Sequence, residues 1–318
     1  MRKRCLIIGL GQIGMGYDYN NDNDILTHAH AISSHPSFEL VGGVDPSENR
    51  ITLFAKKYRK PAYGTITSAL RAAKADIIVV ATPANTHFEI AKIILDNATP
   101  EAILCEKPLA NNIGDAKAIV NMCKSADTTL YTNFIRRSEP GAIAIRENFF
   151  NQRVDTQFKG SFWYSKGLYN NGSHFINLSA FWLGQFKNSQ LLQIDDIKKA
   201  DPEPDFLINF ERGSVVFQSL KDKNFSYYAA EFFCKSGRFL YEDGGKEIRL
   251  HLLEDSLSDT KSKKLKSEYE LIPNDMKCYQ WHVYDQIHRH YSGKKCNISM
   301  GEDALETAYA IDEIIRQF

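Results

Sequence analysis

A short apolar run near the N-terminus ends in glycines at GxGxxG spacing, in the sequence Cys5-Leu6-Ile7-Ile8-Gly9-Leu10-Gly11-Gln12-Ile13-Gly14. This pattern predicts a buried strand that turns sharply toward a helix. Gly9 permits the tight turn, Gly11 lets the backbone approach a pyrophosphate, and Gly14 allows the helix to pack closely on the strand. A glycine-rich turn that holds no ligand is the alternative, and only residues further along the chain can decide between the two.

The helix that should follow Gly14 is displaced along the chain. Residues 15–27 are polar and rich in Asn and Asp, which is typical of a loop. Thr27 is the better N-cap for a helix that continues through Ile32. The acidic residues of the segment lack the glycine and the terminal carboxylate of a calcium loop. We therefore expect a solvated loop, with a flap over cofactor or substrate as the alternative.

Three histidines, His28, His30 and His35, lie on or near this displaced helix. No carboxylate accompanies them at the spacing that metal ligands need. The sequence therefore predicts histidines on the surface of a helix rather than a metal site.

Strands and helices alternate up to residue 105. The expected strands span residues 38–44, 76–81 and 102–105, and the expected helices span residues 47–58, 66–74 and 88–97. This alternation predicts a doubly wound parallel sheet. In such sheets ligands bind beyond the carboxyl ends of the strands, which directs attention to residues 82–87 and 106–108.

Asp45 stands at the end of the second expected strand. An acidic residue there accepts hydrogen bonds from the ribose hydroxyls of a dinucleotide, and its charge repels a 2′-phosphate. It therefore favours NAD, with NADP less suited to the site. The alternative is an ordinary turn residue ahead of Pro46.

Lys107 lies between Glu106 and Pro108 at the end of a buried strand. An ammonium at this place can hydrogen-bond a hydroxyl, stabilise a developing alkoxide and relay a proton. A structural ion pair with Glu106 or another acid is the alternative.

Asn170, His174 and Asn177 have a spacing that brings them to one face of a helix if that helix begins early. His174 is a candidate general base. A histidine on an otherwise apolar helix is, however, more often a core residue whose polar atoms are satisfied.

The second half of the chain alternates between apolar and polar residues. After an expected strand at residues 157–164, further expected strands span residues 205–210, 214–220, 225–234, 238–241, 247–253 and 269–272. This pattern predicts a mainly antiparallel sheet. The charged residues 256–266 are expected to form a hairpin tip or mobile loop, and helices are expected near residues 279–291 and 301–316.

The chain of 318 residues is long enough for two domains, and its 39 basic and 39 acidic residues give no net charge. This balance provides no general attraction for a nucleic acid or an anionic membrane, so the expected partner is a small molecule. The lack of a long apolar run or cleavable leader predicts a cytoplasmic protein. The six scattered cysteines are expected to be free thiols.

The order of four motifs resembles the Gfo/Idh/MocA family of nicotinamide-dependent oxidoreductases. These are GLGQIG at residue 9, VDPS at residue 44, ATPANTHFEIA at residue 81 and CEKPLA at residue 105. The resemblance continues through residues 132–140, 170–183 and 299–304. It implies an α/β fold with a Rossmann domain at residues 1–131 and an α+β substrate and oligomerisation domain with an open-faced sheet at residues 132–318. It also implies a homodimer or homotetramer and a cis bond before Pro108.

The resemblance also implies roles for individual residues. Lys107 is the lysine of the family's EKP motif, and His174 is the histidine of its AspxxxHis segment, in which Asn170 replaces the aspartate. An amide can orient a substrate, but it cannot stabilise a charged imidazole as an aspartate does. The residues expected to bind the cofactor are Gly9, Gly11, Gln12, Ile13, Gly14, Asp45, Thr82, Pro83, Asn85, His87, Glu106 and Lys107.

Together these features predict an NAD-dependent dehydrogenase that acts on a secondary alcohol of a sugar or nucleotide-linked sugar, without a metal. A regulatory protein that binds NAD as a signal is one alternative. Another is an elimination or glycoside cleavage in which the same oxidation recycles NAD. The sequence does not set the direction of the reaction.

Overall fold

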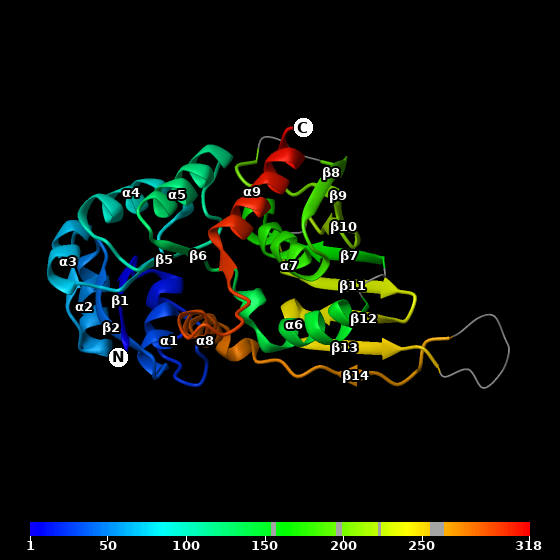
Figure 1. The fold of residues 1–318 in the computed structure, drawn as a ribbon, viewed down its shortest axis with the longest axis horizontal. Helices are drawn as coiled ribbons and strands as arrows, with labels where there is room; N and C mark the ends of the chain where they lie inside the picture. The colour runs from blue at the N-terminus through cyan, green and yellow to red at the C-terminus, as the bar shows by residue number, and fades with distance from the viewer. Residues whose placement is uncertain (154–156, 195–198, 222–223, 255–263) are drawn as a thin grey trace. The chain divides into compact units, whose positions relative to one another are not determined.

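The computed structural model of the chain describes residues 1–153, 157–194, 199–221, 224–254 and 264–318, which form two compact units (Figure 1). Unit 1 combines Met1–Ser138 with Lys277–Ala308, and unit 2 combines Glu139–Met276 with Tyr309–Phe318. The sequence-based division assigned everything after residue 131 to the second domain. In the structure Lys277–Ala308 belongs to unit 1, because the apolar face of its helix is buried there with Val283, Tyr284 and Ile287.

Unit 1 is built on a sheet with the strand order β15-β6-β5-β4-β1-β2-β3. The strands are β1 (Lys3–Ile8), β2 (Phe38–Val44), β3 (Ala62–Tyr63), β4 (Ile77–Val80), β5 (Ala102–Cys105), β6 (Thr129–Thr132) and β15 (Ser299–Met300). Neighbouring strands are parallel except for the pair of β15 and β6. The expected Rossmann-type parallel sheet is therefore confirmed.

Helices cover both faces of this sheet. The helices of unit 1 are α1 (His28–Ser34), α2 (Glu48–Tyr58), α3 (Ile66–Ala73), α4 (His87–Asn97), α5 (Ile113–Ser125) and α8 (Tyr279–Tyr291). Side chains of α3, α4 and α5 share one core with alternate strand residues, whereas those of α1, α2 and α8 share the other core with the intervening residues. Strand residues such as Ile7 and Leu104 are fully buried. Truncating one to alanine is expected to cost about 2–5 kcal/mol.

The register of the strands brings their carboxyl ends together. Ile8 pairs with Val44 on one side and with Val80 on the other, and Val80 pairs with Cys105. The residues that follow these strand ends therefore lie along one edge of the sheet. This edge carries the glycine turn, Asp45, the loop after β4 and Glu106-Lys107-Pro108.

Unit 2 is built on a sheet with the order β14-β13-β12-β11-β7-β10-β9-β8. The strands are β7 (Phe158–Tyr164), β8 (Phe186–Gln193), β9 (Asp205–Phe210), β10 (Gly213–Ser219), β11 (Ala229–Cys234), β12 (Gly237–Glu242), β13 (Glu247–Leu252) and β14 (Glu270–Leu271). Only β7 and β10 pair in parallel, so the expected mainly antiparallel sheet is confirmed. The sequence did not predict β8, because this edge strand is mostly polar and exposed.

Among the described residues, helices cover one face of the second sheet and leave large side chains of the other face exposed. Its helices are α6 (Pro140–Ile145), α7 (Ser173–Leu183) and the end of α9 (Gly301–Ile315), which continues from unit 1. They enclose an aromatic core in which Trp182 stacks with Phe150 at 5.6 Å between ring centroids. Trp163 and Phe233 are exposed large side chains of this sheet.

The cysteines among the described residues are all free thiols, as expected, and three of them are buried. The prediction for the charged segment 256–266 falls largely on residues 255–263, which lie outside the described ranges.

Candidate functional site

The three glycines after β1 serve different purposes. Gly9 has φ +100°, and a Cβ there would lie 2.4 Å from the carbonyl oxygen of Ala81. A Cβ on Gly14 would lie 2.1 Å from the carbonyl oxygen of Gly9. At Gly11 the φ is −76°, and the nearest atom to an added Cβ is Arg50 Nη1 at 4.0 Å. The packing of the turn requires glycine at positions 9 and 14, whereas Gly11 faces open space that suits the close approach of a ligand.

A π-turn, η1 (Gln12–Gly16), follows Gly11 in place of a continuous helix. The N–H groups of Met15 and Gly16 donate to the Gly11 carbonyl at 3.0 and 3.1 Å. Gly11 has no side chain that could cap this turn, and no hydrogen bond of the described residues brings a side chain to its first N–H groups. The N-terminus of η1 is therefore available to an anion.

A cavity of about 670 Å³ opens beside the turn, within the size range of small-molecule sites of roughly 300–1,000 Å³. Its lining includes seven of the residues that the sequence predicted for the cofactor: Gly9, Gly11, Gln12, Ile13, Asp45, Thr82 and Pro83. Of the other residues predicted for the cofactor, Gly14, Asn85, His87, Glu106 and Lys107 are not among the described lining residues. The structure thus brings the glycine turn, Asp45 and the start of the Thr82 loop around one space.

Asp45 is buried at the end of β2 and held in a fixed orientation. Its Oδ2 accepts from the N–H of Leu10 at 3.0 Å, and its Oδ1 accepts from the N–H of Ser47 at 2.9 Å. Arg50 Nη1 lies 3.3 Å from Oδ2. Because a carboxylate offers about four acceptor positions, Asp45 keeps capacity for a further donor such as a ribose hydroxyl.

The ring of His87 holds the loop after β4 in place. The two ring nitrogens of this buried histidine lie 2.9 Å from the Thr82 carbonyl oxygen and 3.1 Å from that of Leu109. The hydroxyl of Thr86 donates to the Thr82 hydroxyl at 2.8 Å. His87 therefore positions the loop, while Thr82 and Pro83 line the cavity.

Glu106 forms the centre of a buried polar network at the end of β5. Its Oε1 lies 2.9 Å from His28 Nε2 and accepts from Asn133 Nδ2 at 2.5 Å. Burial acts to raise the pKa of Glu106, but the hydrogen bonds from His28 and Asn133 and the charge of Lys107 lower it overall. The network thus holds an ionised carboxylate next to Lys107. The peptide bond between Lys107 and Pro108 is cis, as expected.

The prediction that His28 and His35 are surface residues was wrong. His28 is fully buried, with its Nδ1 3.0 Å from the Tyr284 hydroxyl, and His35 is buried with its ring against Trp281. Their partners lie in α8, about 250 residues further along the chain, so local periodicity could not reveal them.

The prediction of a solvated loop for residues 15–27 was wrong at Asp18. This carboxylate is fully buried, and it accepts from the N–H groups of Leu26 and Thr27 at 2.8 and 3.0 Å. It also accepts from the Thr27 hydroxyl and contacts His30 Nδ1. The predicted N-cap is confirmed, since the Thr27 side chain accepts from the His30 N–H at the start of α1.

In unit 2, another π-turn, η6 (Leu168–Gly172), leads directly into α7. Asn170 is exposed on the turn, whereas His174 and Asn177 are buried in α7. The carboxylate of Asp201 accepts from the N–H groups of Tyr169 and Asn170 at 2.8 and 3.0 Å. Asp201 therefore fixes the backbone that carries Asn170. No local pattern predicts this contact, because Asp201 lies 31 residues away.

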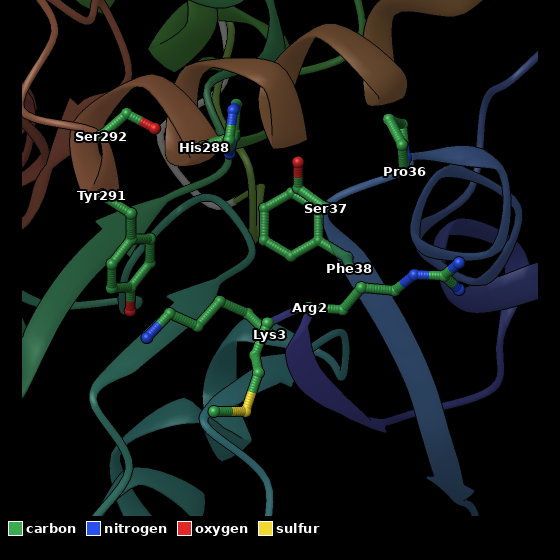
Figure 2. A pocket seen from close by; sticks show the side chains of 9 residues that line it. Arg2, Lys3, Pro36, Ser37, Phe38, His288, Tyr291 and Ser292 are labelled. Carbon is green, nitrogen blue, oxygen red and sulfur yellow. The ribbon is translucent and has the colours of Figure 1, made fainter.

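Figure 2 shows a second cavity of unit 1, of about 470 Å³. It lies at the opposite edge of the sheet, where Lys3 begins β1 and Phe38 begins β2. Lys3 extends beside Tyr291, with its Nζ 4.7 Å from the ring centroid, and also forms an ion pair with Glu101. Because ligands of parallel sheets bind beyond the carboxyl ends of the strands, this cavity is not the expected dinucleotide site.

The described ranges contain neither a candidate metal cluster nor a helix suited to span a membrane. No group of three or more His, Cys, Asp or Glu residues is arranged to hold a metal ion in this part of the chain. None of the helices described there combines the length and apolar character needed to cross a bilayer.

Comparison with known proteins places these residues in context. The sequence model of an oxidoreductase family with an NAD-binding Rossmann fold matches residues 3–134. Myo-inositol 2-dehydrogenase of Thermotoga maritima is 27% identical over 152 residues, which are 48% of this chain and 42% of that enzyme. UDP-N-acetylglucosamine 3-dehydrogenase of Acidithiobacillus ferrooxidans is 26% identical over 44% of this chain and 41% of that enzyme. The chain thus matches less than half the length of these curated relatives.

The likeness of fold extends further than the likeness of sequence. The WlbA dehydrogenase of Bordetella pertussis, solved in complex with NADH and UDP-GlcNAcA, covers 100% of this chain and 96% of its own, with a TM-score of 0.74. Its sequence identity is 16%, so this comparison shows the two-part fold alone.

Proposed function

Because the chain belongs to the Gfo/Idh/MocA family of NAD-binding oxidoreductases, we propose that it is an NAD-dependent dehydrogenase. The proposed reaction transfers a hydride between nicotinamide and a secondary alcohol, or the corresponding ketone, of a sugar or nucleotide-linked sugar. The family's Rossmann fold matches residues 3–134, which include the glycine turn and Lys107.

One observation carries the cofactor assignment. The open N-terminus of η1 and the buried carboxylate of Asp45 line the same cavity. Gly11, which the packing of the turn does not require to be glycine, lines this cavity too. These features fit a pyrophosphate at the turn and an adenosine ribose at Asp45.

Asp45 supports a preference for NAD over NADP. Hydrogen bonds from two backbone N–H groups hold its carboxylate in place, so the carboxylate would not turn away from a 2′-phosphate. A 2′-phosphate would meet this negative charge directly. Arg50 offsets part of the repulsion, since its guanidinium lies 3.3 Å from the same carboxylate.

In the proposed reaction, bound NAD⁺ supplies the hydride acceptor. The imidazole of His174 takes the proton of the substrate hydroxyl as general base, and in the reverse direction it acts as general acid. The Lys107 ammonium polarises the same oxygen and relays the proton. Asn170 orients the substrate through its amide. The ionised Glu106 next to Lys107 is consistent with this role, because it places a negative charge beside the ammonium.

The names of the relatives support a polyol or sugar substrate. One acts on myo-inositol and another on UDP-N-acetylglucosamine. Both substrates carry ring hydroxyls on secondary carbons, which is the group that His174 would deprotonate.

A second candidate function is a regulatory protein that binds NAD without turnover. The observation that favours it is Asn170, which stands where the family pattern has an aspartate. The retention of both Lys107 and His174 favours the enzyme.

We also propose that the chain forms a homodimer or homotetramer. The open face of the sheet in unit 2 exposes Trp163 and Phe233, and exposed apolar side chains on an uncovered sheet are typical of an interface. Sedimentation velocity of the purified protein would test this, and a monomer across micromolar concentrations would contradict it.

The function is tested with the purified chain, NAD⁺ and a panel of inositols, sugars, sugar acids and nucleotide sugars, by following the absorbance of reduced nicotinamide. With an active substrate, His174→Ala and Lys107→Ala should each lower kcat about 10²–10⁴-fold. His251→Ala, a histidine of β13, serves as the matched control and should retain activity. Bound NAD without turnover of any compound would favour the regulatory protein. Unchanged kcat in both catalytic variants would refute their roles.

A further inference from the structure

The segment between the glycine turn and α1 carries a feature that the dehydrogenase assignment does not use. Tyr17 lines the cavity beside Gly11 and Gln12, yet 60% of its surface is exposed. Its hydroxyl makes no hydrogen bond to any described residue of the chain. Tyr19, two positions later, donates its hydroxyl to the Leu53 carbonyl at 3.1 Å. The two tyrosines of the segment are therefore used differently, and only Tyr17 faces the site.

The backbone on both sides of Tyr17 is anchored. The N–H of Tyr17 donates to the Gln12 carbonyl at 2.9 Å, which closes η1. The next residue is the fully buried Asp18, whose carboxylate is bonded to Leu26, Thr27 and His30. An aromatic side chain between two such anchors is held at the cavity with little freedom of its backbone.

A third anchor fixes the segment against α2. Lys57 Nζ donates to the carbonyl oxygens of Asp18 and Tyr19 at 3.2 and 2.6 Å. It also lies 5.1 Å from the centroid of the Tyr19 ring. Because α2 begins directly after the Asp45 loop, the segment is tied to the same helix that borders the cavity with Arg50.

The conformation of Tyr17 is consistent with its place in the lining of the cavity. Tyr17 follows η1 with φ −56° and ψ −37°, which is still helical. Side chains of helical residues lean back over the residues three and four positions earlier. For Tyr17 these include Ile13, which lines the same cavity as Gly11 and Gln12.

We propose that the Tyr17 hydroxyl donates a hydrogen bond to the pyrophosphate of the bound dinucleotide. The inserted segment thereby adds a hydroxyl donor to the backbone N–H groups of the turn. This role rests on the proposed function, since it requires that the cavity binds a dinucleotide.

Isothermal titration calorimetry of the full chain with NAD⁺ and with ADP-ribose tests the proposal. ADP-ribose keeps the pyrophosphate and lacks the nicotinamide. Tyr17→Phe should raise the Kd of both ligands about five- to tenfold, because a hydrogen bond to a charged group is lost. Tyr17→Ala should weaken both at least as much. Tyr269→Phe, which alters a tyrosine of 48% exposure in unit 2, is the matched control and should leave both Kd values unchanged.

The outcomes separate this proposal from the proposed function. If the unaltered chain binds neither ligand, the dinucleotide assignment itself fails. If the unaltered chain binds both and Tyr17→Phe binds them equally well, only the role of the Tyr17 hydroxyl is refuted. A loss confined to NAD⁺ would place the hydroxyl at the nicotinamide riboside and overturn the pyrophosphate contact.

Discussion

Two of the π-turns in the described ranges, η1 and η6, have the same local form but opposite surroundings. η1 follows Gly11 in unit 1, and η6 follows Gly167 in unit 2. A Cβ on Gly167 would lie 1.9 Å from Asp201 Oδ2, whereas a Cβ on Gly11 would have no atom closer than 4.0 Å. The N–H groups of η6 are taken by the chain's own carboxylate, and those of η1 face a cavity.

The two turns differ in what occupies the space beside their glycine. A glycine before a helical turn does not by itself show what the turn does, because a side chain would clash at Gly167 but not at Gly11. What occupies the space decides the role of the turn. At η6 the occupant is Asp201, so the turn serves to position Asn170. At η1 none of the described residues occupies this space, and the pyrophosphate of the dinucleotide is the occupant that we propose.

The largest expected effect comes from filling the open position of η1. Gly11→Ala should raise the Kd for NAD⁺ on the order of 10- to 100-fold, because an extra methyl in a tight contact costs about 1–3 kcal/mol. Its melting temperature should stay close to that of the unaltered chain, since no protein atom is displaced. Gly14→Ala is the contrasting variant and should lose stability, because its Cβ would overlap the Gly9 carbonyl. Calorimetric titration and thermal melts of both variants provide the measurement. Tight NAD⁺ binding by Gly11→Ala would contradict a ligand contact at Gly11.

The second prediction concerns Asp45, at the other end of the same cavity. Asp45→Ser should weaken NAD⁺ binding about tenfold, because hydrogen bonds to the ribose are lost. It should strengthen NADP⁺ binding, since the repelling charge is gone and Arg50 remains. Asp45→Asn, which keeps the shape, should show the same change in discrimination with a smaller loss for NAD⁺. An unaltered chain that binds NADP⁺ more tightly than NAD⁺ would show that Asp45 has been misinterpreted.

Removing the occupant of η6 should affect stability rather than cofactor binding. Asp201→Asn retains one acceptor oxygen for two N–H donors and should cost about 1–2 kcal/mol in the free energy of unfolding, as measured by urea titration. Its Kd for NAD⁺ should remain within about twofold of the unaltered value. An unchanged unfolding free energy would contradict the role assigned to Asp201.

The last prediction concerns the pH dependence of the stability that Asp18, the buried carboxylate just after η1, provides. Burial acts to raise the pKa of Asp18, but hydrogen bonds from His30 and Thr27 lower it overall. A carboxyl whose folded pKa lies below its unfolded value of about 3.9 stabilises the fold at neutral pH. That stabilisation is lost as the pH falls through the folded pKa. Asp18→Asn should therefore be less stable at pH 7 by about 1–2 kcal/mol, with the gap narrowing below about pH 4. A gap that stays constant with pH would indicate that the Asp18 charge is unimportant.

The features that the sequence predicted correctly are those with a local signal. The buried strands, the GxGxxG turn and the Thr27 N-cap each depend on residues within a few positions of one another. The motif order then indicated the family, including the cis bond before Pro108.

The features that the sequence missed depend on distant partners. His28 is buried because Glu106 and Tyr284 receive its ring, 78 and 256 positions away. Asp18 and Asp201 were not predicted as anchors, because a carboxylate in a polar segment gives no sign of whether it is buried. Tyr17 and Arg50 were not identified as cavity residues, although the position of Arg50 in the first turn after the Asp45 loop was a usable signal.

The central claim is that the open turn of unit 1 binds the pyrophosphate of NAD. Calorimetric titration of the full unaltered chain with NAD⁺, repeated with Gly11→Ala, tests it most directly. If η1 binds the pyrophosphate, one NAD⁺ should bind per chain. The Kd should be at least tenfold higher in the variant, at an unchanged melting temperature. Absence of NAD⁺ binding at millimolar concentration, or equal affinity in the two proteins, would contradict pyrophosphate binding at this turn.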